Sequence, residues 1–227
     1  MEEKIQEFYY DSVKEHYRIH AVRWLPDKLP PRGIVQISHG IAEYVLRYTG
    51  FARFLASKGF LVVGNDHLGH GGSYAGDRDK GFFAEKGGWS MVVRDMNTLR
   101  ERTMREYPDV PYFLFGHSMG SFLARTYLIQ YPGTLTGCVL SGTGQQSAAA
   151  CDLGLAVAAG EKLRLGPYGR SKLVDKMCFG TYNSHIPDRR SPYDWLSRDA
   201  KLVDRYVQDP DCGFLPTISL VMDMLGG

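Results

Sequence analysis

The sequence contains no long apolar run and no recognisable leader. No stretch of the 227 residues approaches the roughly 18 consecutive apolar residues that a membrane-spanning helix requires. Met1 is followed by Glu2 and Glu3, not by a basic start, an apolar region and a small-residue cleavage site. We therefore expect neither a membrane-spanning helix nor a secretory signal.

The sequence has few cysteines and no cluster of like charges. The four cysteines are widely spaced and form no Cys-x-x-Cys pair, so we expect no zinc or other metal site and free thiols in a cytoplasmic protein. The formal net charge is +2, and the Lys and Arg residues form no basic stripe. Nothing here indicates a nucleic acid partner, and we expect no cofactor.

What the sequence does contain is a regular alternation of strand-like and helix-like segments. Residues 5–25 alternate around a polar break and predict an antiparallel pair of strands. Later apolar runs predict strands at 33–38, 60–64, 111–115 and 135–140. Helical spacing or capping predicts helices at 44–58, 89–107 and 122–130. Such strands are buried on both faces, which predicts an α/β fold with a mostly parallel central sheet flanked by helices.

The pattern changes after Ser141-Gly142. Residues 148–162 and 199–207 look helical, the sequence between them is irregular and rich in Gly, Pro and Tyr, and no strand signal appears. An apolar helix is expected at 217–225. We predict a core over 1–143, a helical cap or lid inserted over 144–216, and the start of a return to the core at 217–227.

One motif carries chemistry: Gly116-His117-Ser118-Met119-Gly120 fits Gly-x-Ser-x-Gly. It lies between a predicted strand and a predicted helix. A turn this sharp exposes the serine hydroxyl above the sheet, and glycines flank it because a side chain there would collide with its neighbours. We expect Ser118 to be a nucleophile, with Gly116 and Gly120 supporting the turn. The alternative is a chance match in an ordinary turn.

Acyl transfer also needs donors for the developing oxyanion. One should be the backbone N–H of Met119, the residue after the nucleophile. The second should come from the loop after strand 33–38, which begins with His39 and Gly40, and we assign it to the N–H of Ile41. The competing interpretation of His39-Gly40 is an ordinary turn at the end of a strand.

Four segments of the predicted core form a recognisable set: Ser38-His39-Gly40-Ile41-Ala42-Glu43, Arg47-Tyr48, residues 65–73 and the Ser118 motif. Together they resemble the monoglyceride lipase and lysophospholipase family of α/β-hydrolases, and residues 193–199 and 209–214 are similar to the cap of a bacterial branch of that family. The resemblance implies that the protein is a serine esterase that hydrolyses a lipid-like carboxylic ester with a medium or long acyl chain. It also implies that the cap encloses the acyl chain. It also leads us to expect peripheral contact between the cap and a membrane.

His67 and His70 beside Asp66 could suggest a metal site, but their glycine-rich surroundings match a structural turn in that family. Glu43 is expected to support the oxyanion loop through hydrogen bonds. Its alternative role as a general acid is disfavoured because hydrolases of this fold place the acid later in the chain.

The acid and base of the triad are not found. In this fold the triad follows the chain order Ser, then Asp or Glu, then His. The only histidine after Ser118 is His185, which lies in the predicted cap. Family members continue with two further strand–helix units, so we expect a C-terminally truncated enzyme. Its strand 135–140 would be an exposed edge open to self-association, and its activity would be impaired. The alternatives are a hydrolase-like protein that binds an acyl ligand or a partner chain, and a peptidase or thioesterase on the same fold.

Overall fold

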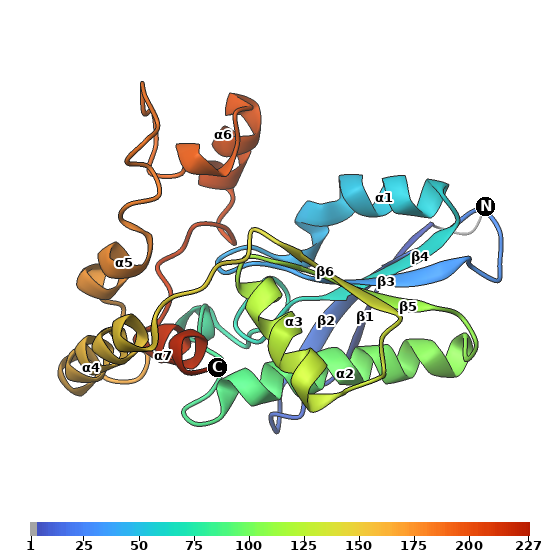
Figure 1. Ribbon diagram of the computed structural model, residues 1–227, viewed down its shortest axis with the longest axis horizontal. Coiled ribbons are helices and arrows are strands. Elements are labelled where there is room, and N and C mark those ends of the chain that lie inside the picture. The colour runs from blue at the N-terminus through green and yellow to red at the C-terminus, as the bar shows by residue number, and fades with distance from the viewer. Residues whose placement is uncertain (1–3) are drawn as a thin grey trace.

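A computed structural model describes residues 4–227. The expectation that there is no secretory signal rests partly on residues 1–3, which lie outside the described residues. The centre of the molecule is a six-stranded sheet in the order β1-β2-β4-β3-β5-β6 (Figure 1). The first two strands and the β2–β4 pair are antiparallel, and β4, β3, β5 and β6 run parallel. The strands are β1 (Ile5–Asp11), β2 (Arg18–Trp24), β3 (Gly33–Ser38), β4 (Phe60–Asn65), β5 (Tyr112–His117) and β6 (Gly137–Ser141). The predicted α/β fold and its sheet are therefore confirmed.

Helices cover both faces of this sheet. On one face lies α1 (Thr49–Ser57), preceded by the 3₁₀ turn η1 (Val45–Tyr48), so the predicted helix at 44–58 is two pieces. On the other lie α2 (Gly88–Glu106) and α3 (Met119–Gln130), which begins three residues before the predicted start. Two apolar clusters fill the space between the layers, one under α1 and a larger one under α2 and α3. Burying these faces is the main force that holds helices to sheet.

The rest of the chain is helical and lies beside the carboxyl ends of the parallel strands (Figure 1). It consists of α4 (Ala148–Leu165), α5 (Lys172–Phe179), η3 (Asp194–Leu196), α6 (Ala200–Gln208) and α7 (Ile218–Gly226). The 3₁₀ turn η2 (Asp77–Asp79) belongs to the loop after β4. Helix α7 packs against α4 through Ile218 and Val221, and its Leu220 reaches the larger core cluster. It therefore joins the helical segment to the core.

The expectation of irregular sequence between residues 163 and 198 was wrong for α5. Its first turn is capped by the Ser171 side chain, which accepts the backbone N–H of Val174 at 3.3 Å. Val174 is buried against Ala158 of α4 and the two apolar residues of α7. The helix forms because this tertiary contact buries one face of an otherwise short segment.

Within residues 4–227, no helix combines the length and the apolar character needed to cross a membrane. The four cysteines form no disulfide.

Candidate functional site

Ser118 lies at the turn between β5 and α3, with φ 53° and ψ −121°. A non-glycine residue rarely adopts this left-handed conformation, so the surrounding structure must hold it there. The Ser118 N–H donates to the carbonyl of Ser141 at 2.9 Å, and its carbonyl accepts both the N–H and the hydroxyl of Ser121. The turn is therefore fixed from the neighbouring strand and from the first turn of α3.

The two predicted glycines permit this turn to pack. A β-carbon on Gly116 would lie 2.4 Å from the carbonyl oxygen of Gly120, and one on Gly120 would lie 2.0 Å from that of Ser38. Real β-carbons do not approach backbone atoms this closely, so neither position accommodates a side chain. Close contact of α3 with β5 requires Gly116, and close contact of α3 with β3 requires Gly120.

Sheet register brings the loop after β3 next to Ser118. Ser38 pairs with Gly116 in the parallel ladder, so the chain leaving β3 emerges beside the serine turn. A β-carbon on Gly40 would lie 3.2 Å from the β-carbon of Ser118. The N–H groups of Ile41 and Met119 have no hydrogen-bond partner within residues 4–227. The two predicted donors thus belong to adjacent segments, and both are available.

Glu43 organises this loop. Its carboxylate accepts the N–H of Gly40 at 2.6 Å and the hydroxyl of Tyr48 at 2.7 Å, and it forms an ion pair with Arg47. The side chain is largely buried, and these three donors satisfy its oxygen atoms.

His39 connects this loop to the turn after β4. Its Nδ1–H donates to the carbonyl of Gly40 at 2.8 Å, and its Nε2 accepts the N–H of His67 at 3.0 Å. Burial, reinforced by the neighbouring His67 and His70, holds the pKa of His39 well below its usual value. The ring is therefore neutral in this tautomer, which satisfies both partners.

His67 and His70 lie in the buried turn after β4. Burial lowers the pKa of His67 to about 3 and that of His70 to about 4. Each ring hydrogen-bonds to backbone, His67 to the His39 carbonyl and His70 to that of Leu68. Asp66 beside them accepts the N–H groups of Val45 and Gly72 and bonds to His20, so the segment is used structurally.

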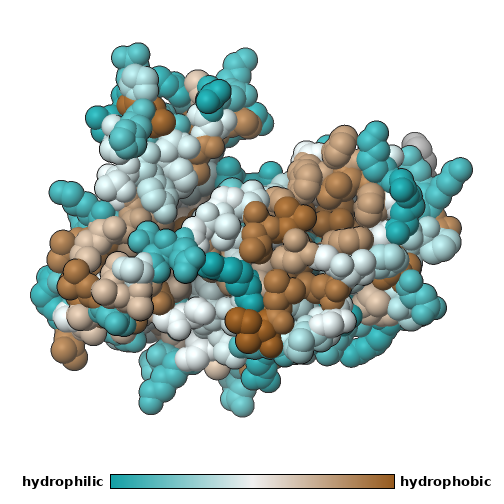
Figure 2. Space-filling view, viewed as in Figure 1, coloured by the Kyte–Doolittle hydropathy of each residue, from teal (hydrophilic) through white to brown (hydrophobic). Residues whose placement is uncertain are grey.

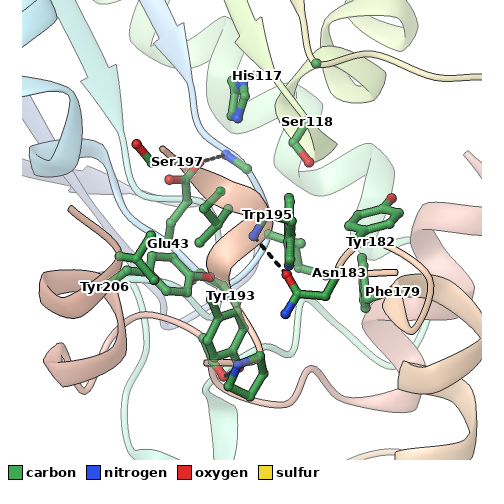
Figure 3. Close-up of a pocket in the computed structure, with 18 of the residues that line it drawn as sticks. Glu43, His117, Ser118, Phe179, Tyr182, Asn183, Tyr193, Trp195, Ser197 and Tyr206 are labelled. Carbon is green, nitrogen blue, oxygen red and sulfur yellow. Dashed lines mark hydrogen bonds between the residues drawn. The ribbon is translucent and has the colours of Figure 1, made fainter. Parts of the chain in front are cut away.

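Ser118 and His117 line a cavity of about 940 Å³ (Figure 3). Its volume lies in the range of small-molecule sites. The opposite wall comes from the helical segment, where the Asn183 side chain accepts the backbone N–H of Trp195 at 2.9 Å. Most of that wall is apolar or aromatic: Phe179, Tyr182, Ile186, Tyr193, Trp195, Leu196, Leu202, Val203, Tyr206, Phe214 and Pro216.

The described residues place no acid–histidine pair beside Ser118. Within residues 4–227 its hydroxyl has no hydrogen-bond partner, and the His117 ring instead lies 3.1 Å from the Ser141 hydroxyl. His185 is exposed and does not line the cavity. Three of the later carboxylates have local uses: Asp199 caps α6, Asp204 pairs with Arg190, and Asp209 accepts the Tyr44 hydroxyl at 2.7 Å.

The sequence predicted the serine turn and the loop after β3, and the resemblance assigned 193–199 and 209–214 to a cap, but it named no individual side chain of the cavity wall. A signal was present for α5, since its apolar residues recur at helical spacing after the serine cap. For Tyr206 and Phe214 no local pattern distinguishes a cavity wall from an ordinary buried face.

Comparison with known proteins agrees with this geometry. Residues 29–227 match the hydrolase family described as "Serine aminopeptidase, S33". The chain is 32% identical to the monoacylglycerol lipase of Mycolicibacterium smegmatis over 187 residues, which cover 82% of this chain and 58% of that protein. It is 35% identical to human monoglyceride lipase over 117 residues, 52% of this chain and 36% of the lipase. The matched region therefore spans less than two thirds of the length of either relative.

Among solved structures, a highly thermostable carboxyl esterase from Bacillus coagulans superimposes with a TM-score of 0.87 at 31% identity. The match covers 99% of this chain and 72% of the esterase.

Proposed function

The chain belongs to the hydrolase family described as "Serine aminopeptidase, S33", with an α/β-hydrolase fold, and we propose that the protein hydrolyses carboxylic esters with Ser118 as nucleophile. The observation that carries the proposal is the position of Ser118, held in a strained strand–helix turn with its side chain at a largely apolar cavity. Two free backbone N–H groups beside it supply what an ester carbonyl needs as it becomes an oxyanion.

In the proposed reaction, Ser118 Oγ attacks the ester carbonyl carbon and gives up its proton to a general base, which residues 4–227 do not supply beside it. The N–H groups of Ile41 and Met119 hold the oxyanion, and His39, Gly40, Gly116 and Gly120 keep both segments in place. The C–O bond then breaks, the alcohol leaves with a proton, and an acyl-enzyme remains. Water releases the acid and restores the serine.

The cavity wall supports a lipid-like ester as substrate. Aromatic and aliphatic side chains of the helical segment suit a medium or long acyl chain, whose burial stabilises binding by about 0.8 kcal/mol per CH₂ group. The named functions of the relatives, monoacylglycerol and monoglyceride lipases, agree with such an ester. We propose that residues 144–216 act as a cap domain over the core of residues 1–143, with 217–227 returning to that core.

A second candidate is an acyl-binding protein of little or no activity. It is favoured by one observation, that the Ser118 hydroxyl has no hydrogen-bonded base within residues 4–227. An un-ionised serine is a weak nucleophile. A peptidase or thioesterase is the remaining alternative, and the description of the matched family favours the former.

A substrate panel separates these candidates. The protein is assayed with p-nitrophenyl esters of increasing chain length, a monoacylglycerol, an acyl thioester and an aminoacyl p-nitroanilide. The ester proposal predicts turnover of the first two, abolished by Ser118→Ala. Preferred cleavage of the anilide or thioester would replace it with one of the alternatives, and binding without turnover would favour the acyl-binding protein.

We also propose that the helical segment contacts membranes peripherally. Leu163 of α4 is 91% exposed, and Leu173 and Met177 of α5 are also exposed. Basic residues lie among them: Lys162, Arg164, Lys172 and Lys176. Co-sedimentation with phosphatidylglycerol vesicles, lost in Leu163→Ser/Leu173→Ser, tests this contact.

A further proposal is self-association through β6. This strand pairs only with β5 within the described residues, and its Val139 and Leu140 are exposed. Figure 2 shows apolar side chains gathered on the face where β6 lies. Edge strands of this kind pair with other chains. Sedimentation velocity showing a stable monomer at high concentration would exclude the contact.

The free thiols of the four cysteines support a cytoplasmic location, which fractionation would test.

A further inference from the structure

The loop that carries Ile41 is held by two hydrogen bonds from the helical segment. The carbonyl of Ala42 accepts the hydroxyl of Tyr206 at 2.9 Å and the N–H of Gly213 at 3.0 Å. Both donors lie more than 160 residues away in sequence. Ala42 itself has φ 52°, a conformation that L-residues adopt only when contacts hold it.

The other side of Ile41 is held by the core. The Gly40 carbonyl, which shares a peptide group with the Ile41 N–H, accepts the Nδ1–H of His39 at 2.8 Å, and Glu43 accepts the N–H of Gly40 in the preceding peptide group. The N–H of Ile41 therefore lies between two anchors, Gly40 held by His39 and Glu43, and the Ala42 carbonyl held by Tyr206 and Gly213. Its direction depends on both.

Side-chain packing connects the two anchors. Tyr206 belongs to α6 and is only 7% exposed. The Arg47 guanidinium lies 4.7 Å from the centre of its ring, and the same Arg47 pairs with Glu43. The Tyr193 ring packs edge-on against Tyr206 at 5.1 Å, and its hydroxyl donates to the Gly213 carbonyl. Displacing α6 would therefore disturb the contacts of both anchors.

Tyr206 and Tyr193 also line the cavity (Figure 3), as does Val203 of α6. A molecule that fills the cavity packs against the same side chain that holds the Ala42 carbonyl. The wall that contacts an acyl chain and the loop that carries an oxyanion donor are thus one connected unit.

We propose that Tyr206 is a positioning residue that makes the Ile41 oxyanion donor depend on the placement of α6. The inference rests on the proposed function for its catalytic consequence. When α6 closes on a bound acyl group, the Ala42 carbonyl is held and the Ile41 N–H is directed to the ester oxygen. When α6 moves away, that donor is lost.

The test compares Tyr206→Phe with Tyr74→Phe. The first variant keeps the ring against Arg47 and removes only the hydroxyl. The second removes a similar hydroxyl bond between core and helical segment, from Tyr74 to Asp211 at 2.9 Å, away from the cavity. We expect Tyr206→Phe to lower kcat for a p-nitrophenyl ester by about tenfold with KM changed less than twofold, because the donor acts in the transition state. Tyr74→Phe should change neither constant by more than twofold. A rise in KM alone for Tyr206→Phe, or equal effects of the two variants, would overturn the proposal.

A second readout does not require turnover. Amide hydrogen exchange at Gly40, measured by NMR, reports whether the loop stays anchored. We expect Tyr206→Phe to accelerate this exchange by about fivefold, the equivalent of one lost hydrogen bond, and Tyr74→Phe to leave it unchanged. If the wild-type protein proves inactive, the ester proposal fails, and the exchange rates alone test the positioning role of Tyr206. Unchanged exchange at Gly40 in Tyr206→Phe would then refute it.

Discussion

The α-carbon of Gly120 lies so close to Ser38 that an added β-carbon would stand 2.0 Å from the Ser38 carbonyl oxygen. This contact between α3 and β3 sets the distance between the serine turn and the loop that carries Ile41. We predict that Gly120→Ala lowers the free energy of unfolding by about 3 kcal/mol or more, since a backbone atom cannot yield as a flexible side chain can. Chemical denaturation measures the loss.

Gly160→Ala is the matched control for this change. Gly160 lies within α4 and a β-carbon there would meet nothing within 4 Å. Alanine in an open helical position should stabilise the protein by about 0.5–1 kcal/mol. Equal destabilisation by the two substitutions would contradict the close-contact explanation for Gly120.

A buried carboxyl in α2 should make stability depend on pH. Asp95 accepts the N–H of Val13 at 2.8 Å and the hydroxyl of Ser12 at 2.7 Å, but burial raises its pKa to about 6. The folded state therefore binds the proton more tightly than the unfolded state. Between about pH 4 and 6 the stability contributed by this group falls as pH rises, and the loss is complete above the folded-state pKa.

Asp95→Asn removes this titration. We predict that the stability of the wild type relative to the variant falls by about 2–3 kcal/mol from pH 3.5 to pH 7.5, corresponding to a shift of about two pKa units. Urea unfolding of both proteins at several pH values measures the difference. Parallel stability curves would show that Asp95 does not titrate in this range.

The wall formed by α5 should set the preferred chain length. Phe179 lines the cavity and packs on Tyr182 with ring centres 5.8 Å apart. We expect Phe179→Ala to deepen the cavity and to shift the best kcat/KM among p-nitrophenyl esters toward longer chains, with a loss of up to about tenfold for short ones.

Met177→Ala tests whether the change in chain-length preference arises from the cavity wall. Met177 lies on the same helix and is 46% exposed. It should leave the chain-length profile of these soluble esters unchanged. An identical shift in both variants would indicate a general disturbance of α5.

The parts of the fold that could be predicted are those with local signals. Each parallel strand is a short apolar run, and Ser118 lies in a spaced motif between a strand and a helix, so the sheet and the serine turn follow from neighbouring residues. The contact of Tyr206 with Ala42 joins residues 164 positions apart and depends on how α6 packs, which no periodicity encodes. Helix α5 was missed although its serine cap and apolar spacing are helical, because so short a segment is stabilised mainly by its contacts with Ala158 and α7.

The most direct test of the central claim is covalent labelling of Ser118. The protein is treated with a fluorophosphonate probe, digested, and mapped by mass spectrometry, with Ser118→Ala treated in parallel. An activated serine beside two oxyanion donors predicts one adduct, on the peptide that contains Ser118, and none in the variant. An unlabelled wild type, or equal labelling of the variant, would contradict the assignment of Ser118 as a working nucleophile.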